Sequence, residues 1–162
     1  MQSWIKYLLI FCYVLAGCHK DEPEPVRWTD RTVLVYMVAE NTLNGWTTRN
    51  LDRMLKTFQG EGNLLVYIDS YDGDPRLVKL VMNDNGIASA ETVKTYQERN
   101  SASPDILKQT INEVCVEYPA WSYGLVLWSH GTGWLPSTSK SRAFGQDGNN
   151  WMELNGLASA LP

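Results

Sequence analysis

One histidine of this sequence stands where proton-transfer chemistry is favoured. His130 follows a short apolar run and precedes two closely spaced glycines, in the segment Y-G-L-V-L-W-S-H-G-T-G-W at residues 123–134. Histidine is the side chain best suited to accept and return a proton near neutral pH. Gly131 and Gly133 let the main chain approach a bound carbonyl group, so that backbone N–H groups reach its oxygen. We interpret His130 as a general base; the alternative is a polar residue that only completes the hydrogen bonds of a turn.

The residues before His130 predict the element that positions it. Residues 125–127 are continuously apolar, which is typical of a strand buried on both faces of a parallel sheet. In open α/β sheets, ligands and catalytic groups gather at the carboxyl ends of such strands, where loops line a crevice. We therefore expect His130 at the carboxyl edge of a parallel sheet.

The rest of the chain supplies the other elements of an α/β fold. Strands are predicted at 32–39 and 64–68, with an amphipathic helix between them that ends at Gly60, and this order gives a crossover between parallel neighbours. Further predicted elements are a hairpin of 76–82 with 87–95, a helix at 104–118, a turn region at 144–150 and a short helix within 152–161. Residues 69–74 are acidic but lack the ligand spacing of a calcium loop, so we interpret them as a plain turn.

Cys115 is the cysteine of the predicted folded domain, and its surroundings favour a structural role. Apolar residues recur at helical spacing around it: Ile106, Leu107, Ile111, Val114 and Tyr118. A free cysteine buried in such a stripe behaves as a small hydrophobic residue. We therefore expect Cys115 to lie in the core, to be unreactive and to form no internal disulfide.

The first 17 residues are predicted to be a secretory signal peptide. Lys6 precedes an apolar run that is too short to span a bilayer. The sequence L-A-G-C at 15–18 looks like a bacterial lipobox, in which Cys18 is lipidated and becomes the new first residue; the alternative is an ordinary cleaved signal. Residues 18–30 then form a lipid-anchored tether, and residues 31–162 form the folded domain. We expect a bacterial outer-membrane lipoprotein, bound to the membrane through its anchor and facing the periplasm or the cell exterior.

Composition and charge argue against one class of partner. The chain has 44% hydrophobic and 20% charged residues, as a single globular domain does. Its formal net charge is -4, and it has no basic run with interleaved aromatic residues, which nucleic-acid surfaces require. We therefore expect no nucleic-acid partner.

Three segments together resemble the clostripain-like cysteine peptidases of the caspase-type clan. They are V-L-V-Y-M-V-A-E-N-T-L at 33–43, G-L-V-L-W-S-H-G-T-G-W at 124–134, and F-G-Q-D at 144–147 followed by M-E-L and A-S-A-L. The resemblance implies a caspase-like α/β/α sandwich with a mostly parallel central sheet. It implies an endopeptidase that cleaves peptide or protein substrates after Arg or Lys. It also implies that His130 is the catalytic histidine and that the N–H of Gly131 helps to hold the oxyanion.

The resemblance further implies a nucleophile that these residues do not contain. In the family it is the cysteine of an Asp-Ala-Cys motif, and no such motif occurs in the 162 residues. We therefore expect a chain that stops before the nucleophile, with a sheet incomplete at its carboxyl end and no activity alone. Family members can be matured by a cut after a basic residue beyond the histidine, which makes Lys140 and Arg142 candidate processing sites; the alternative is a solvated surface loop. No cofactor is evident, and calcium is implied by family analogy only.

Two other functions fit parts of the sequence. The segment H-G-T-G-W at 130–134 resembles the H-G-G-G oxyanion loop of α/β-hydrolase esterases, although no G-x-S-x-G motif occurs here. A non-catalytic surface lipoprotein that keeps the fold only for binding is the second. Four tryptophans near the carboxyl-terminal end of the sequence could line its binding groove: Trp121, Trp128, Trp134 and Trp151. The same residues would equally fit the edge of a hydrophobic core.

Overall fold

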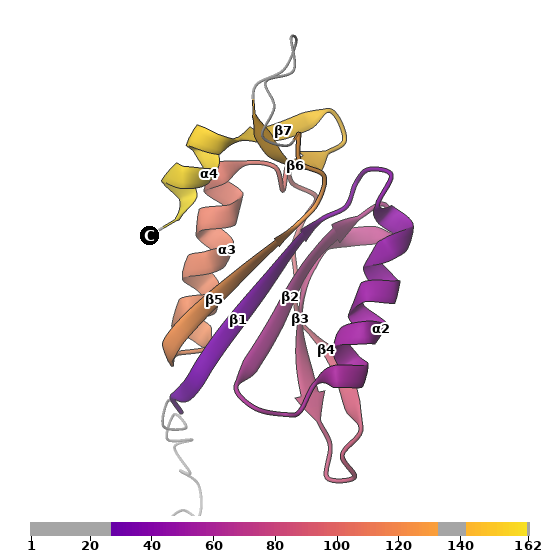
Figure 1. Cartoon of the computed structure of the whole chain (residues 1–162), viewed down its shortest axis with the longest axis vertical. Helices are drawn as coiled ribbons and strands as arrows, with labels where there is room; N and C mark the ends of the chain where they lie inside the picture. The colour runs from indigo at the N-terminus through magenta and orange to yellow at the C-terminus, as the bar shows by residue number, and fades with distance from the viewer. Residues whose placement is uncertain (1–26, 133–141, 162) are drawn as a thin grey trace, which may run out of the picture.

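The computed structural model describes residues 27–132 and 142–161 (Figure 1). The predicted signal peptide, Cys18 and Lys140 lie outside these residues. A five-stranded sheet has the strand order β4-β3-β2-β1-β5. Its strands are β1 (Thr29–Val38), β2 (Asn63–Ser70), β3 (Gly73–Met82), β4 (Ala88–Thr95) and β5 (Ala120–Trp128). Within the two described ranges, no helix has the length and apolar character needed to cross a membrane.

The centre of the sheet is parallel. Leu34 of β1 pairs with Leu65 of β2 on one side and with Leu125 of β5 on the other. β3 and β4 extend the sheet beyond β2 as an antiparallel hairpin. The parallel strands β2, β1 and β5 therefore end at one edge of the sheet, which we call the carboxyl edge.

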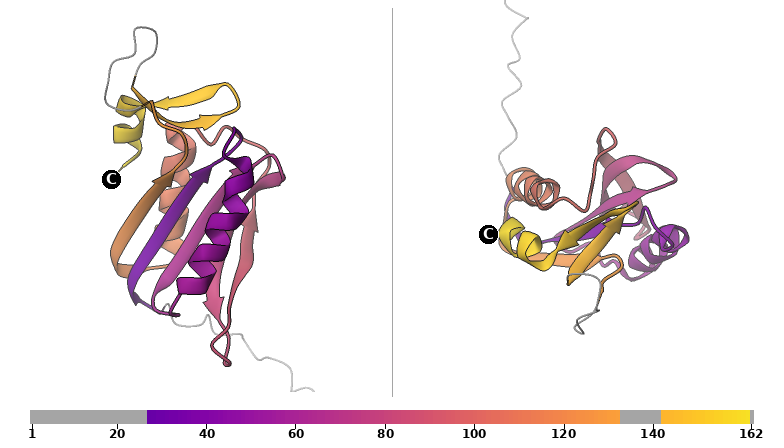
Figure 2. Two further views of the ribbon diagram at one scale, coloured as in Figure 1. Left: turned by 45° about the vertical axis from the view of Figure 1, so that its right-hand side comes forward. Right: turned by 90° about the horizontal axis from the view of Figure 1, so that it is seen from above.

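Helices cover both faces of this sheet. α2 (Thr47–Thr57) lies on one face and α3 (Pro104–Glu117) on the other, as Figure 2 shows. Because side chains alternate along a strand, β1 directs Met37 into the core under α2 and Tyr36 into the core under α3. The helix residues that pack on these cores are Leu51, Met54, Leu55 and Phe58 of α2, and Leu107, Ile111 and Val114 of α3. The predicted caspase-like α/β/α arrangement is confirmed.

Most predicted elements are also confirmed. The strands predicted at 32–39, 64–68, 76–82 and 87–95 correspond to β1 to β4, and the helix predicted at 104–118 corresponds to α3. The helix between β1 and β2 is preceded by a short 3-10 turn, η1 (Asn44–Trp46). It ends at Thr57, shortly before Gly60, whose φ of 80° favours glycine.

The prediction that the strand before His130 is buried on both faces is wrong. Val126 of β5 is 48% exposed, whereas its neighbours Leu125 and Leu127 are partly buried. Among the described strands β5 pairs with β1 alone. The core under α2 is built from β1, β2 and β3 and takes Trp128 from β5. The apolar run therefore belongs to an edge strand of the described sheet, with one face partly open.

The turn region predicted at 144–150 is a two-stranded hairpin instead. It consists of β6 (Ala143–Asp147) and β7 (Asn150–Glu153), and the last helix, α4 (Leu154–Ala160), begins directly after it. Gly145 and Gly148 have positive φ values of 78° and 52°. The glycines that suggested a turn thus supply a strand irregularity and the hairpin bend. The hairpin lies at the carboxyl edge, beside the ends of β1 and β5 (Figure 1).

Candidate active site

His130 lies just beyond β5 at the carboxyl edge. Its Nε2 atom lies 2.8 Å from Oγ1 of Thr42. Thr42 belongs to the turn that follows β1, the parallel neighbour of β5. The imidazole is partly buried and the threonine is exposed. A hydrogen bond at Nε2 fixes the orientation of the ring, so that Nδ1 is the ring nitrogen that could exchange a proton with a bound group.

Polar side chains form hydrogen bonds that connect the end of β5 to β1 and β6. The hydroxyl of Ser129 donates to the carbonyl of Val38 at 2.6 Å and accepts from the N–H of Gln146 in β6 at 3.1 Å. The side-chain amide of Asn41 donates to the same two residues, at 3.1 Å to the carbonyl of Val38 and at 2.6 Å to that of Gln146. These bonds join β1, β5 and β6 and hold the backbone on either side of His130.

Gly131 pairs with Phe144 of β6 in an isolated antiparallel bridge. The carbonyl of His130 accepts from the N–H of Gly145 at 2.9 Å, and the N–H of Thr132 donates to the carbonyl of Ala143 at 3.1 Å. In this antiparallel pattern the N–H of Gly131 itself points away from β6. Gly131 is exposed and has no positive φ, so its backbone conformation does not require glycine. The position therefore offers a backbone N–H group that is directed away from β6.

Cys115 does not approach His130. It lies on α3 and lines an apolar pocket with Thr32 of β1 and Tyr123 of β5. Both are in the amino-terminal halves of their strands, whereas His130 follows the carboxyl end of β5. Burial raises the pKa of the Cys115 thiol, which lowers its reactivity. The residue is partly rather than fully buried, and its place against the sheet supports the structural interpretation.

Arg142 is the processing candidate that lies within the described residues. Its side chain is exposed, but its carbonyl accepts from the N–H of Leu154 at 3.1 Å. The N–H of Ala143, on the other side of the same peptide bond, donates to Oγ1 of Thr132 at 2.9 Å. Cleavage after Arg142 therefore requires two hydrogen bonds to open first.

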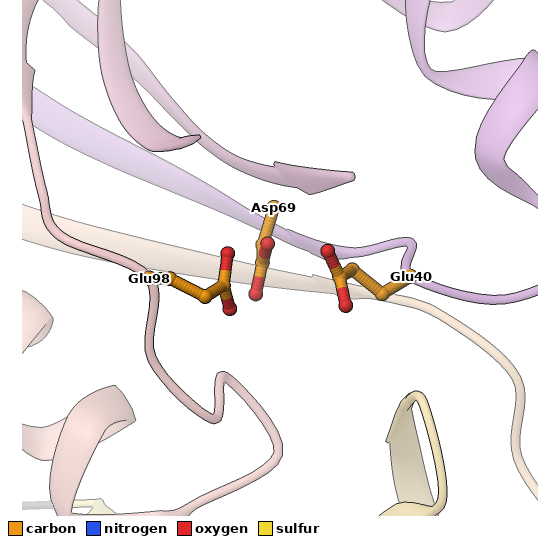
Figure 3. Close-up of side chains that lie close together, drawn as sticks. All are labelled: Glu40, Asp69 and Glu98. Carbon is orange, nitrogen blue, oxygen red and sulfur yellow. The ribbon is translucent and has the colours of Figure 1, made fainter. Parts of the chain in front are cut away.

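Three carboxylates at the same edge were missed by the sequence analysis. Glu40 follows β1, Asp69 lies near the end of β2 and Glu98 follows β4, and one oxygen from each lies within 4.8 Å of the others (Figure 3). The interpretation of 69–74 as a plain turn is wrong at its start, because Asp69 is a fully buried residue of β2. The signal that could have found this carboxylate cluster is the position of each acidic residue at or after the end of a predicted strand.

The electrostatics of this carboxylate cluster are unfavourable for negative charge. Burial and the nearby charges of Asp147, Glu98 and Glu40 raise the pKa of Asp69 to about 7, against a lowering effect of Ser101. Burial also raises the pKa of Glu40, and the charges of Glu98 and Asp147 add to that effect. Carboxylate oxygens are the ligands that hard cations prefer. The cluster is therefore a group in the described part of the chain that could hold a metal ion.

Comparisons with known proteins agree on one family. The Clostripain family model matches residues 35–162. Among solved structures, the chain is similar to a B. fragilis cysteine protease with 42% identity and a TM-score of 0.61, over 70% of this chain and 98% of that one. No curated protein matches the sequence.

Two further solved structures are similar over more of this chain. One is a secreted cysteine protease from Bacteroides thetaiotaomicron in complex with an irreversible peptide inhibitor, with 37% identity and a TM-score of 0.70 over 81% of this chain. The other is an inactive zymogen protease from Parabacteroides distasonis, with 40% identity and a TM-score of 0.68 over 85% of this chain. The chain spans 38% and 40% of the lengths of these two proteins.

Proposed function

Because the chain belongs to the clostripain family of cysteine proteases, we propose that it supplies the catalytic histidine, His130, of an endopeptidase that cleaves after Arg or Lys. The observation that carries the proposal is the hydrogen bond between Nε2 of His130 and the hydroxyl of Thr42 at the carboxyl edge. This bond orients the imidazole from the neighbouring strand, beside the outward N–H of Gly131. Membership of the family removes the support for an esterase.

The proposed chemistry follows from this arrangement. The imidazole of His130 takes the proton of a cysteine thiol, and the thiolate attacks the carbonyl carbon of the scissile peptide. The N–H of Gly131 donates to the oxygen that becomes negative. Collapse of the tetrahedral intermediate breaks the C–N bond, and the imidazolium gives its proton to the leaving amine. The same histidine then removes a proton from water, which hydrolyses the thioester.

The nucleophilic cysteine of this proposal lies outside the 162 residues. They contain no Asp-Ala-Cys motif, and Cys115 lies toward the other end of the strands from His130. β5 pairs with β1 alone among the described strands, so its other side can accept a further strand. Parallel neighbours lie about 4.8 Å apart, and a cysteine at the carboxyl end of such a strand would come close to His130. Residues 1–162 alone would then be inactive.

The proposal includes an anchor and a maturation step. Cys18 would carry lipid and hold the protein at the bacterial outer membrane. Maturation would cut the chain after Lys140 rather than after Arg142, because two hydrogen bonds hold the peptide bond that follows Arg142. The similarity to a protease described as an inactive zymogen is consistent with such a step.

Covalent labelling of the nucleophile tests the proposal. The gene product is isolated from its own cells and treated with a peptide inhibitor that carries Arg or Lys and alkylates cysteine. Mass spectrometry should find the label on a cysteine outside residues 1–162, and His130→Ala should prevent labelling. Cys115→Ala is the control and should label like the wild type. Label on Cys115 would overturn the proposal, and no label on any cysteine would favour a non-catalytic binding module.

A further inference from the structure

Asp69 is a buried carboxylate with no ion pair among the described residues. Its side chain is fully buried, yet neither of its carboxylate oxygens has a hydrogen-bond partner among the described residues. Buried carboxylates in proteins are normally paired, protonated or bound to metal. In Figure 3 the Asp69 carboxylate lies between those of Glu40 and Glu98. Its immediate surroundings therefore add negative charge instead of neutralising it.

The side chain of Arg99, which follows Glu98 in the sequence, makes its hydrogen bonds to residues outside the carboxylate cluster. Nε of Arg99 donates to the hydroxyl of Tyr67 at 3.2 Å, and Nη2 donates to Oγ1 of Thr110 in α3 at 3.3 Å. The guanidinium also lies 3.7 Å from the ring centroid of Tyr96. Within the described ranges no salt bridge joins Arg99 to the carboxylate cluster. Any positive charge that neutralises the carboxylate cluster therefore comes from outside these side chains.

We propose that Glu40, Asp69 and Glu98 bind one hard divalent cation, and that Ca²⁺ is the ion that fits them. All three side chains offer oxygen, the ligand atom that hard cations prefer over nitrogen and sulfur. The three oxygens lie within 4.8 Å of one another, and two ligands on one Ca²⁺ ion can lie up to about 5 Å apart. Ca²⁺ also accepts several carboxylate ligands in a flexible geometry, whereas Mg²⁺ demands a nearly ideal octahedron and usually keeps several waters.

A cation at this position stabilises the turn that holds His130. Glu40 lies in the same turn as Thr42, whose hydroxyl contacts Nε2 of the histidine. The main-chain carbonyl of Glu40 accepts from the N–H of Gly148 and from the hydroxyl of Tyr71, each at 2.9 Å. The ion thus links the ends of β1 and β2, the segment after β4 and, through Gly148, the β6–β7 hairpin. It acts on the position of the histidine and touches no reacting atom.

Cation binding can be measured on the purified 162-residue chain without any enzymatic activity, so it is tested separately from the proposed function. Ca²⁺ added to the chelator-treated protein should raise the melting temperature and displace Tb³⁺, detected by luminescence excited through tyrosine. Asp69→Asn should weaken Ca²⁺ binding by more than about tenfold, because it removes a charged ligand. In chelator the same variant should melt at a higher temperature than the wild type, because it removes an unpaired buried charge.

A matched variant separates ligand loss from loss of charge in general. Asp84→Asn makes the same chemical change at an exposed position between β3 and β4, and it should keep the full Ca²⁺ response. An absent Ca²⁺ response in the wild type, or an equal response in Asp69→Asn, would overturn the site. A larger response to Mg²⁺ would overturn the choice of ion. A melting-temperature rise with acetyl-arginine amide that Asp69→Asn abolishes would overturn the proposal in favour of a pocket for basic substrate side chains.

Discussion

Two groups of polar residues at the carboxyl edge differ in how their hydrogen bonds are satisfied. Around His130, Nε2 has a partner at 2.8 Å and the hydroxyl of Ser129 both donates and accepts. Around Asp69, the carboxylate is fully buried and has no partner among the described residues. The strands that lead to these two groups, β5 and β2, flank the same strand, β1. Both groups therefore follow a neighbour of β1, although β2 is an inner strand and β5 an edge strand of the described sheet.

The hydrogen bonds around His130 hold that site in place without a ligand, whereas the carboxylate cluster depends on one. Completed hydrogen bonds fix side chains before any ligand binds. A buried carboxylate without a partner destabilises the fold by its lost hydration, and a cation that binds only the folded state reverses that effect. The His130 region is thus organised by the chain itself, and the carboxylate cluster reaches its stable form with an ion.

The largest expected effect is on catalysis. His130→Ala should lower kcat/KM of the active gene product for an Arg peptide by about a thousandfold or more, because the base and the nucleophile act as a unit. The melting temperature should change little, since His130 is partly exposed. A fluorogenic Arg peptide and thermal unfolding measure the two quantities. An enzyme that keeps its activity in His130→Ala would show that another residue is the base.

Ser129→Ala and Asp69→Asn are expected to change the free energy of unfolding in opposite directions. Ser129→Ala should lower the free energy of unfolding by about 1–3 kcal/mol, because it leaves the N–H of Gln146 without its acceptor. Asp69→Asn in chelator should raise the same quantity. Urea unfolding of both variants beside the wild type measures it. Destabilisation by both would show that Asp69 has a partner in solution and that the two groups are alike.

A smaller effect is expected from the residue that orients the histidine. Thr42→Val keeps the shape of the side chain but removes the hydroxyl that contacts Nε2. It should lower kcat by about tenfold, the loss of roughly 1.4 kcal/mol that one hydrogen bond supplies, with little change in KM. Thr42→Ser restores the hydroxyl and should restore kcat. Equal kcat in the valine and serine variants would remove Thr42 from the site.

The sequence predicts the His130 site but not the carboxylate cluster, because the residues of the first are adjacent in the sequence and those of the second are not. His130 is found from one continuous segment, in which an apolar strand runs directly into the histidine and its glycine. Glu40, Asp69 and Glu98 are distant in the sequence and meet only because three strand ends converge. The residues next to Asp69 in the sequence predict only a turn, because Glu40 and Glu98 are not among them.

Two errors in the fold have the same physical origin. The apolar run of β5 predicts burial, but burial depends on which strand and helix lie beside it, and α2 covers β1 to β3 instead. The glycines of 144–150 predict a turn, but positive φ at Gly145 and Gly148 also permits a bulged hairpin. Both outcomes are decided by tertiary neighbours that local patterns do not contain.

The smallest expected effect concerns a carboxylate remote from the edge whose partners are complete. Glu113 of α3 accepts from the hydroxyl of Tyr96 and the amide of Gln109, each at 2.9 Å, and lies 3.2 Å from Nζ of Lys94. Burial alone would raise the pKa of Glu113, but these donors outweigh it and the pKa lies below its ordinary value. Glu113→Gln should lower the free energy of unfolding at pH 7 by less than about 1 kcal/mol, as for a partly exposed ion pair.

The pH dependence of that loss identifies its cause. Because the pKa of Glu113 is lower in the folded than in the unfolded state, the stability it contributes is present above the unfolded value of about 4.3 and disappears as the pH falls through the folded value. Wild type and Glu113→Gln should therefore converge in urea unfolding as the pH falls through the folded pKa of Glu113, while Glu117→Gln, an exposed control on the same helix, should match the wild type at pH 7. A loss of stability in Glu113→Gln that persists at low pH would mean that Glu113 acts through packing. Its hydrogen bonds could then not be compared with those that Asp69 lacks.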